Sequence, residues 1–179
     1  MKEITQLESK IVYRNKWMSV REDIIQRPSG TQGIYGVVEK ADFALIIPVQ
    51  NNEIYVVEQY RYPIGRRFWE LPQGSIESRD DVSLDEVAAI ELKEETGLVS
   101  KNMKYVGEQY VAYGYSTQKC HFYLATDLEL KSAKLEEEEE GLISKKIRLV
   151  DFEKMIIDGT IQDAATINAY LLAKLKRLF

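Results

Sequence analysis

The sequence predicts an α+β domain, and three observations lead to this fold class. Most of the chain alternates between short runs rich in β-branched and aromatic residues and clusters of turn residues, as antiparallel strands do. One central segment and two near the end carry helical spacing and capping residues. With 45% hydrophobic and 30% charged residues, the 179-residue chain can bury a core, so it is not a disordered chain.

The first 40 residues predict a small antiparallel meander. Residues 10–27 indicate two strands around a turn at Asn15-Lys16, and a second turn, at residues 28–30, leads to a strand over residues 33–39. We therefore expect residues 1–40 to form an N-terminal extension and residues 41–179 to form the main domain.

A hairpin and a loop region are expected next. Residues 44–49 and 54–60 are two β-branched runs separated by a turn sequence at residues 50–53. The stretch that follows predicts a loop because it is rich in turn residues, namely Pro63, Gly65, Pro72 and Gly74.

A helix is predicted from Ser83 to Thr96. Ser83 is a suitable N-cap with Glu86 three residues further on, and Gly97 closes the helix. The remaining chain predicts three strands, an acidic loop and two helices: strands 103–111, 119–125 and 143–150, the loop 136–140, and helices 151–157 and about 163–178.

Composition limits the chemistry and the partners. The formal net charge of −5 gives no general cationic field for nucleic acid or a membrane surface. The N-terminal segment is too polar for a secretory signal, and no apolar run approaches the roughly 20 residues that span a bilayer. We expect a cytoplasmic protein that binds neither membrane nor nucleic acid.

The single cysteine, Cys120, and the single histidine, His121, exclude several kinds of site. An intramolecular disulfide, a histidine cluster and a zinc finger are impossible, and a catalytic triad would have to use His121. Any chemistry must therefore depend on carboxylates, backbone groups, water and a hard metal ion.

Two glutamates lie on the apolar face of the predicted central helix. At 100° per residue, Leu84, Val87, Ala88 and Leu92 share one arc, and the arc also contains Glu91 and Glu95, about 40° apart. Glu94 lies at its edge. One interpretation is that these side chains reach solvent at the helix end. The other is that a buried cation lies between them, because burying two ionised carboxylates is otherwise costly. Such an ion would be Mg²⁺ or Mn²⁺, which suits phosphate-ester chemistry.

These residues resemble a known family. Gly74, the helix, and the sequence Glu-Leu-Lys-Glu-Glu-Thr-Gly-Leu at residues 91–98 resemble the Nudix box of the Nudix hydrolases. Three further segments are similar to the branch that hydrolyses ADP-ribose and nucleotide sugars: residues 59–63 with 69–74, residues 114–125, and residues 157–167. The resemblance implies a Nudix fold, in which a mixed β-sheet packs between helices.

The resemblance also implies roles for individual residues. Glu91 and Glu95 correspond to metal ligands, Glu94 to a third ligand or a supporting group, and the backbone carbonyl of Gln73 to a further ligand. Arg61 and Glu70 occupy positions that this branch uses around the substrate, with Arg61 on the diphosphate. The base is usually a glutamate of the loop before the last strand; we favour Glu139, then Glu140.

The sequence departs from the family pattern in four places. The stretch from Gly74 to Gly97 is two residues longer than in the family, and the box arginine is replaced by Ile90. The upstream box glutamate has no clear equivalent. Gln118 stands where this branch often has glutamate, which bears on substrate choice.

Several other residues have two open interpretations. Trp69 either packs in the core or stacks on a base, and Arg66-Arg67 either meet phosphate or are solvated. His121 is interpreted as structural rather than catalytic, and Cys120 as a buried or partly buried small hydrophobe.

Together these features predict a metal-dependent hydrolase of ADP-ribose or a related nucleoside diphosphate sugar. The products would be a nucleoside monophosphate and a sugar phosphate. By resemblance we expect a homodimer whose N-terminal strands contribute to the partner's site. The alternatives are a Nudix-fold nucleotide sensor with weakened catalysis, and a Nudix hydrolase of another substrate class such as dinucleoside polyphosphates.

Overall fold

A computed structural model of the chain describes residues 3–75, 82–131 and 140–179. Its contacts divide the chain into two units. The N-terminal unit comprises residues 1–42 and 110–119, and the main unit comprises residues 43–109 and 120–179. Glu139 lies outside the described residues.

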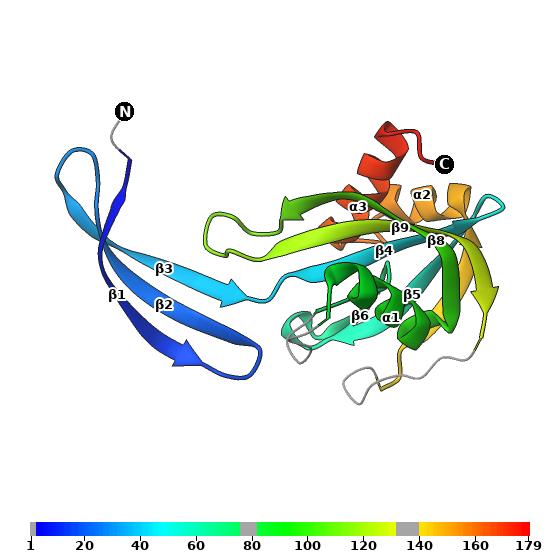
Figure 1. Cartoon of the computed structure of the whole chain (residues 1–179), viewed down its shortest axis with the longest axis horizontal. Coiled ribbons are helices and arrows are strands. Elements are labelled where there is room, and N and C mark those ends of the chain that lie inside the picture. Colours follow the sequence, from blue (N-terminus) through cyan, green and yellow to red (C-terminus); the bar gives the residue numbers. More distant parts are fainter. Residues whose placement is uncertain (1–2, 76–81, 132–139) are drawn as a thin grey trace. The chain divides into compact units, whose positions relative to one another are not determined.

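The N-terminal unit contains an antiparallel three-stranded sheet (Figure 1). Its strands are β1 (Thr5–Arg14), β2 (Met18–Gln26) and β3 (Gln32–Lys40), in the order β1-β2-β3. The side-chain oxygen of Asn15 accepts hydrogen bonds from the backbone N–H groups of Trp17 and Met18, each at 2.9 Å, which closes the first turn. The predicted meander is confirmed, although β1 begins at Thr5 rather than at residue 10.

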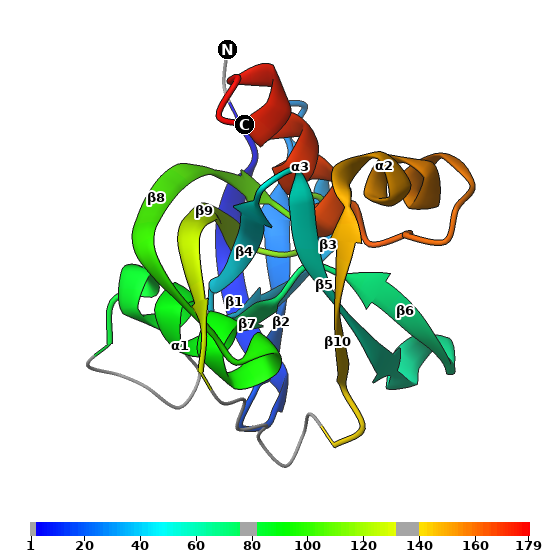
Figure 2. The same cartoon turned by 90° about the vertical axis from the view of Figure 1, so that its right-hand side faces the viewer.

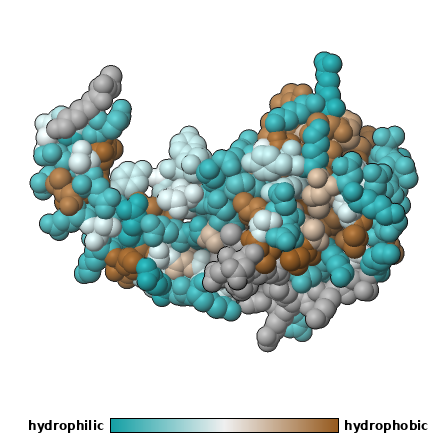
Figure 3. Space-filling model, viewed as in Figure 1, coloured by the Kyte–Doolittle hydropathy of each residue, from teal (hydrophilic) through white to brown (hydrophobic). Residues whose placement is uncertain are grey.

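The sheet of the N-terminal unit leaves apolar side chains on its surface. Every residue of β1 is exposed, and Figure 3 shows apolar atoms scattered among hydrophilic ones on this sheet. Within residues 3–40, the large exposed apolar residues are Ile4, Leu7, Ile11, Val12, Tyr13, Trp17, Ile34 and Tyr35.

The main unit is built on a mixed sheet. The described strands are β4 (Phe43–Gln50), β5 (Glu53–Arg61), β6 (Arg66–Glu70), β7 (Gln73–Ser75), β8 (Leu98–Tyr110), β9 (Lys119–Leu130) and β10 (Ile143–Arg148). They follow the order β10-β5-β4-β9-β8, with β6 paired to β5 and β7 paired to β4. Since β4 is parallel to β9 and antiparallel to β5, the sheet is mixed.

Both faces of this sheet are covered by helices (Figure 2). On β4, Leu45 and Ile47 pack in the cluster that contains α2 (Leu149–Ile157) and α3 (Ala164–Leu175). The alternate residues Ala44 and Ile46 pack with α1 (Leu84–Thr96). Burial on both faces explains why this strand is a nearly continuous apolar run rather than an alternating one. The predicted α+β fold, with a sheet between helices, is confirmed.

Helix α1 begins and ends where local signals place it. The Ser83 side chain accepts from the Glu86 N–H and the Glu86 side chain accepts from the Ser83 N–H, forming a capping box. Gly97 ends the helix with a φ of 72°, a conformation that favours glycine. Among the described residues, none of the helices combines the length and the apolar character that crossing a membrane requires.

The prediction of a loop between residues 61 and 74 is wrong in part. The short helix η1 (Tyr62–Ile64) is followed by β6, which forms a hairpin with β5, and by β7, which pairs with the more distant strand β4. Proline and glycine indicated the turns correctly, but pairing with β5 and β4 satisfies the backbone groups between them. Several boundaries also differ. The largest differences in the main unit are that β8 begins at Leu98 rather than at residue 103 and that β9 ends at Leu130 rather than at residue 125. The last strand ends at Arg148, because α2 begins at Leu149.

Candidate active site

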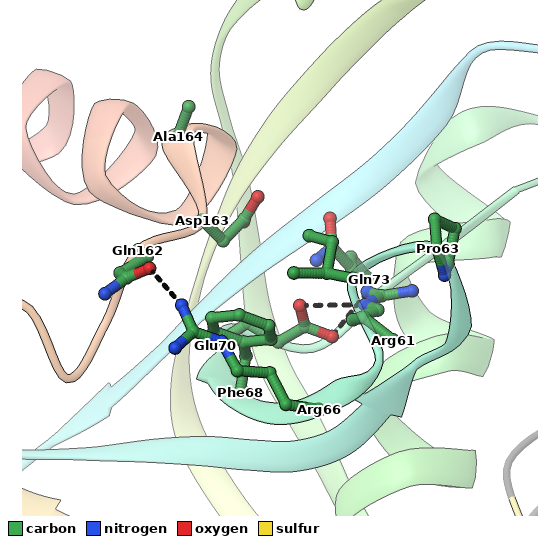
Figure 4. A pocket seen from close by; sticks show the side chains of 10 residues that line it. Arg61, Pro63, Arg66, Phe68, Glu70, Gln73, Gln162, Asp163 and Ala164 are labelled. Carbon is green, nitrogen blue, oxygen red and sulfur yellow. Dashed lines mark hydrogen bonds and ion pairs between the residues drawn. The ribbon is translucent and has the colours of Figure 1, made fainter.

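A cavity of about 450 Å³ opens in the main unit (Figure 4). Its lining comes from the β5–β6 hairpin, from β7 and from the start of α3. The lining residues are Arg61, Pro63, Ile64, Arg66, Phe68, Glu70, Gln73, Gln162, Asp163 and Ala164. Three residues that the sequence predicts for the site, Arg61, Glu70 and Gln73, therefore lie around one cavity.

Strand β6 presents alternate residues to two different surroundings. Arg66, Phe68 and Glu70 line the cavity. The intervening Arg67 bonds to the Glu58 carboxylate and, at 2.7 Å, to the Gly141 carbonyl, while Lys145 lies over the Trp69 ring at 6.0 Å. This is the two-residue period of a β-strand, so pairing with β5 decides which side chains reach the cavity.

Arg61 and Glu70 form a two-pronged ion pair at the cavity wall. Arg61 Nε donates to Glu70 Oε2 at 3.1 Å, and Arg61 Nη2 donates to Oε1. Glu70 is 2% exposed, whereas the Arg61 side chain is 38% exposed. Burial raises the pKa of Glu70 above its ordinary value, and this effect outweighs the opposing attraction of Arg61. The pair fixes the guanidinium plane and leaves other N–H groups of Arg61 available to a ligand.

The raised pKa of Glu70 predicts a pH-dependent term in stability. The Glu70 carboxyl group keeps its proton to a higher pH in the folded state than in the unfolded chain, where its pKa is 4.5. The free energy of unfolding of the wild type, relative to Glu70→Gln, should therefore fall as the pH rises from about 4.5 through the folded pKa, and level off above it. Urea denaturation of both proteins between pH 4 and pH 8 measures this difference. A difference that grows with pH would mean that Arg61 outweighs burial.

The two central glutamates of α1 contact the backbone of β7. Glu91 is 6% exposed and Glu95 is 2% exposed, so both are buried rather than reaching solvent. Glu95 Oε2 accepts from the Gln73 N–H at 3.1 Å. A Cβ added to Gly74 would lie 2.1 Å from Glu91 Cδ, so the Glu91 carboxylate occupies the space that any other residue at position 74 would fill.

This arrangement fits a hard divalent cation. The groups that it brings together, carboxylate oxygens and the backbone of Gln73, are oxygen ligands of the kind that Mg²⁺ and Mn²⁺ prefer. A cation would also offset the cost of burying two carboxylates on one face of the helix. Within residues 3–75, 82–131 and 140–179, no group of three or more His, Cys, Asp or Glu is arranged to hold a metal.

The other predicted acidic residues lie in different surroundings. Glu94 is half-buried on α1, and Glu140 is exposed in the turn before β10. Gly141, which follows it with a φ of 80°, is held through its carbonyl by Arg67. Gly141 is thereby attached to β6, the strand whose other side lines the cavity.

Sequence reasoning assigned no site role to Phe68, Gln162 and Asp163, and left that of Arg66 open. Gln162 and Asp163 come from the loop before α3, where Asp163 accepts from the Thr166 N–H at 2.8 Å as the N-cap. Thr166 in turn accepts from the Leu71 N–H at 2.9 Å, which attaches α3 to the segment after β6. The signal for Asp163 was its N-cap position. Its proximity to β6 required the tertiary structure.

The structure also locates the residues with open interpretations. Trp69 is half-buried and packs against the larger core cluster. Cys120 is buried, as predicted. His121 is 9% exposed, and its Nδ1 lies 3.5 Å from the Glu108 carboxylate. Gln118 donates to the Ala41 carbonyl at 2.7 Å within the N-terminal unit.

Two family models match adjacent segments of the chain. The model described as "Nucleoside diphosphate sugar hydrolase N-terminal domain" matches residues 4–38. The model described as "NUDIX domain" matches residues 40–175, about three quarters of the chain.

Three similar proteins align over most of the chain. An ADP-ribose pyrophosphatase of Bacillus subtilis (strain 168) is 25% identical over 167 residues, which is 92% of this chain and 89% of the relative. An ADP-ribose pyrophosphatase of Mycobacterium tuberculosis (strain ATCC 25618 / H37Rv) is 28% identical over 92% of this chain and 80% of the relative. The methanol dehydrogenase activator of Bacillus methanolicus is 26% identical over 87% of this chain and 80% of the relative.

A solved structure shares the fold. The crystal structure of an ADP compounds hydrolase matches with a TM-score of 0.85, over 97% of this chain and 94% of that chain. At 21% sequence identity, this likeness concerns the fold.

Proposed function

Because the chain belongs to the Nudix family, we propose that it hydrolyses the diphosphate bond of ADP-ribose or a related nucleoside diphosphate sugar. The resemblance seen in residues 91–98 is confirmed by the family model over residues 40–175. Two relatives that align along most of the chain are ADP-ribose pyrophosphatases, which supports this substrate class. The products would be a nucleoside monophosphate and a sugar phosphate.

One observation carries the proposal. The carboxylates of Glu91 and Glu95 lie against the backbone of Gln73 and Gly74, and Gln73 also lines the cavity that contains the Arg61–Glu70 pair. Two buried acids next to a cavity with a fixed guanidinium suit a substrate that carries a diphosphate.

Glu91, Glu95 and the Gln73 carbonyl would hold a divalent cation, Mg²⁺ or Mn²⁺, with Glu94 as a further ligand or supporting group. When bound, such an ion neutralises phosphate oxygens and lowers the pKa of a coordinated water. The capping box and Gly97 position Glu91 and Glu95 because they set where α1 begins and ends.

The other residues orient the substrate and accept the proton. Arg61, held by Glu70, would direct its remaining N–H groups to the diphosphate. Glu139 or Glu140 would take a proton from the attacking water as its oxygen bonds to one phosphorus and the bridging P–O bond breaks. The oxygen of the broken bond stays with the leaving phosphate.

We also propose a cytoplasmic homodimer in which residues 1–40 take part in the subunit contact and in substrate binding. The exposed apolar side chains of β1, including Leu7 and Ile11, support an intersubunit role for this extension. Sedimentation of the full chain and of a variant that lacks residues 1–40 tests it. The full chain should sediment as a dimer and the shortened chain as a monomer.

A substrate panel tests the activity. ADP-ribose, GDP-mannose, UDP-glucose and diadenosine polyphosphates are incubated with Mg²⁺, and the products are identified by mass spectrometry. We expect a nucleoside monophosphate and a sugar phosphate from ADP-ribose or a nucleotide sugar. Tight binding of one compound without turnover would identify a sensor. Turnover of the diadenosine compounds alone would place the protein in another substrate class.

A further inference from the structure

Neighbouring arginines in β6 have opposite surroundings. Arg67 is engaged by the Glu58 carboxylate at 2.8 Å and by the Gly141 carbonyl. Arg66 lines the cavity, donates to Gln162 Oε1 at 2.9 Å and lies over the Phe68 ring at 4.5 Å. Both partners of Arg66 are neutral, so its guanidinium is held in place while its charge is not neutralised.

The other charged groups of the cavity lining have their own partners. Glu70 pairs with Arg61, and the Asp163 carboxylate accepts an N–H at the start of α3, where the helix dipole favours negative charge. Among the described residues, Arg66 is the cation of this lining without a carboxylate within 4.0 Å. The lining contains two arginines and two carboxylates, so its formal charges balance. An anionic ligand in the cavity meets, at Arg66, a guanidinium that has no carboxylate of the described residues within 4.0 Å.

We infer that Arg66 binds a phosphate group of the substrate from this cavity and that Gln162 is the positioning residue that holds its guanidinium. The inference rests on the proposed function, which supplies a diphosphate substrate. A guanidinium has five N–H donors, and the bond to Gln162 uses one, which leaves a pair for two phosphate oxygens. The Phe68 ring and Gln162 restrict the side chain, so less conformational entropy is lost when the phosphate binds.

The test compares Arg66→Gln, Arg66→Lys, Gln162→Ala and the double variant Arg66→Gln/Gln162→Ala. The matched control is Arg148→Gln, which removes the same charge from an exposed arginine paired with Asp151. KM and kcat are measured on the panel compound that the wild type hydrolyses fastest.

For Arg66→Gln we expect KM to rise about 10-fold with kcat within about 2-fold, because a charge-assisted bond to bound substrate is lost. Arg66→Lys keeps the charge and should recover part of the loss. Gln162→Ala should raise KM about 3-fold, and the double variant should match Arg66→Gln, because Gln162 acts through Arg66. A merely structural role for Arg66 would not produce this split of KM from kcat.

Other outcomes overturn the inference or the proposed function separately. A KM for Arg66→Gln within 2-fold of wild type, or an equal rise in Arg148→Gln, overturns the role of Arg66 alone. If the wild type turns over nothing, the proposed function fails, and calorimetric binding of ADP-ribose decides the inference. Weaker binding to Arg66→Gln than to wild type then supports it, while equal binding, or none to the wild type, overturns it.

Discussion

Replacing Glu95 by glutamine should lower kcat by roughly 10³-fold, which corresponds to about 4 kcal/mol of lost transition-state stabilisation. Glu95 is 2% exposed, and its Oε2 accepts the Gln73 N–H. Glutamine has the same shape and an oxygen that can accept this bond, but it lacks the negative charge that would hold a divalent ion. The effect should therefore appear in activity and in Mg²⁺ affinity, and hardly in stability.

Steady-state rates over a range of Mg²⁺ concentrations, with thermal denaturation of the same samples, check this prediction. Glu129→Gln is the charge-matched control, since Glu129 is an exposed residue paired with Lys101. A Glu95→Gln enzyme that keeps more than about a tenth of wild-type activity at moderate Mg²⁺ would contradict the assignment of Glu95 to the metal.

Gly74→Ala should lower activity by about 100-fold with little change in fold, because a displacement of about 1 Å in a catalytic group costs this much. The added methyl carbon would lie 2.1 to 2.4 Å from the Glu91 carboxyl atoms. Gly74 does not have a positive φ, so alanine can adopt its backbone conformation. What must move is the Glu91 carboxylate.

Two further variants separate this clash from other effects. Gly36→Ala adds a methyl group to another strand glycine, where nothing lies within 4 Å, and it controls for the effect on thermal stability. Glu91→Asp withdraws the carboxylate by one methylene. The double variant Gly74→Ala/Glu91→Asp should then be no less active than Glu91→Asp alone. Independent, multiplying losses would show that Gly74 acts through something other than Glu91.

Local signals account for the part of the site that lies on α1. The capping box at Ser83 and the glycine at position 97 define the helix from residues close in sequence. Once its bounds are known, the helical period places Glu91 and Glu95 on the buried face, as the structure has them. Their charge on an apolar face was the feature that indicated chemistry.

The cavity could not be predicted in the same way because its lining brings together residues 61–73 and residues 162–164, which are far apart in the sequence. Proline and glycine in residues 61–74 indicated a loop, whereas β6 forms a hairpin with β5, and the register of this hairpin decides which side chains face the cavity. Arg66 and Arg67 are chemically identical, and only the strand register shows that one lines the cavity. Gln162 joins Arg66 across 96 positions in sequence.

The turn between β5 and β6 has a consequence for how this protein can evolve. Arg61 and Arg66 are paired across a turn that Gly65 closes with a φ of 71°, and every later β6 residue keeps that register. Inserting or deleting one residue there would exchange the two sides of β6, bringing Arg67 and Trp69 to the cavity and removing Glu70 from Arg61. Substitutions at Tyr62, which is 86% exposed, should be tolerated. Changes in the length of the turn should be selected against, because they would alter the cavity even in a protein that still folds. Among related proteins, the number of residues in the turn between β5 and β6 should therefore vary less than the kinds of residue in it.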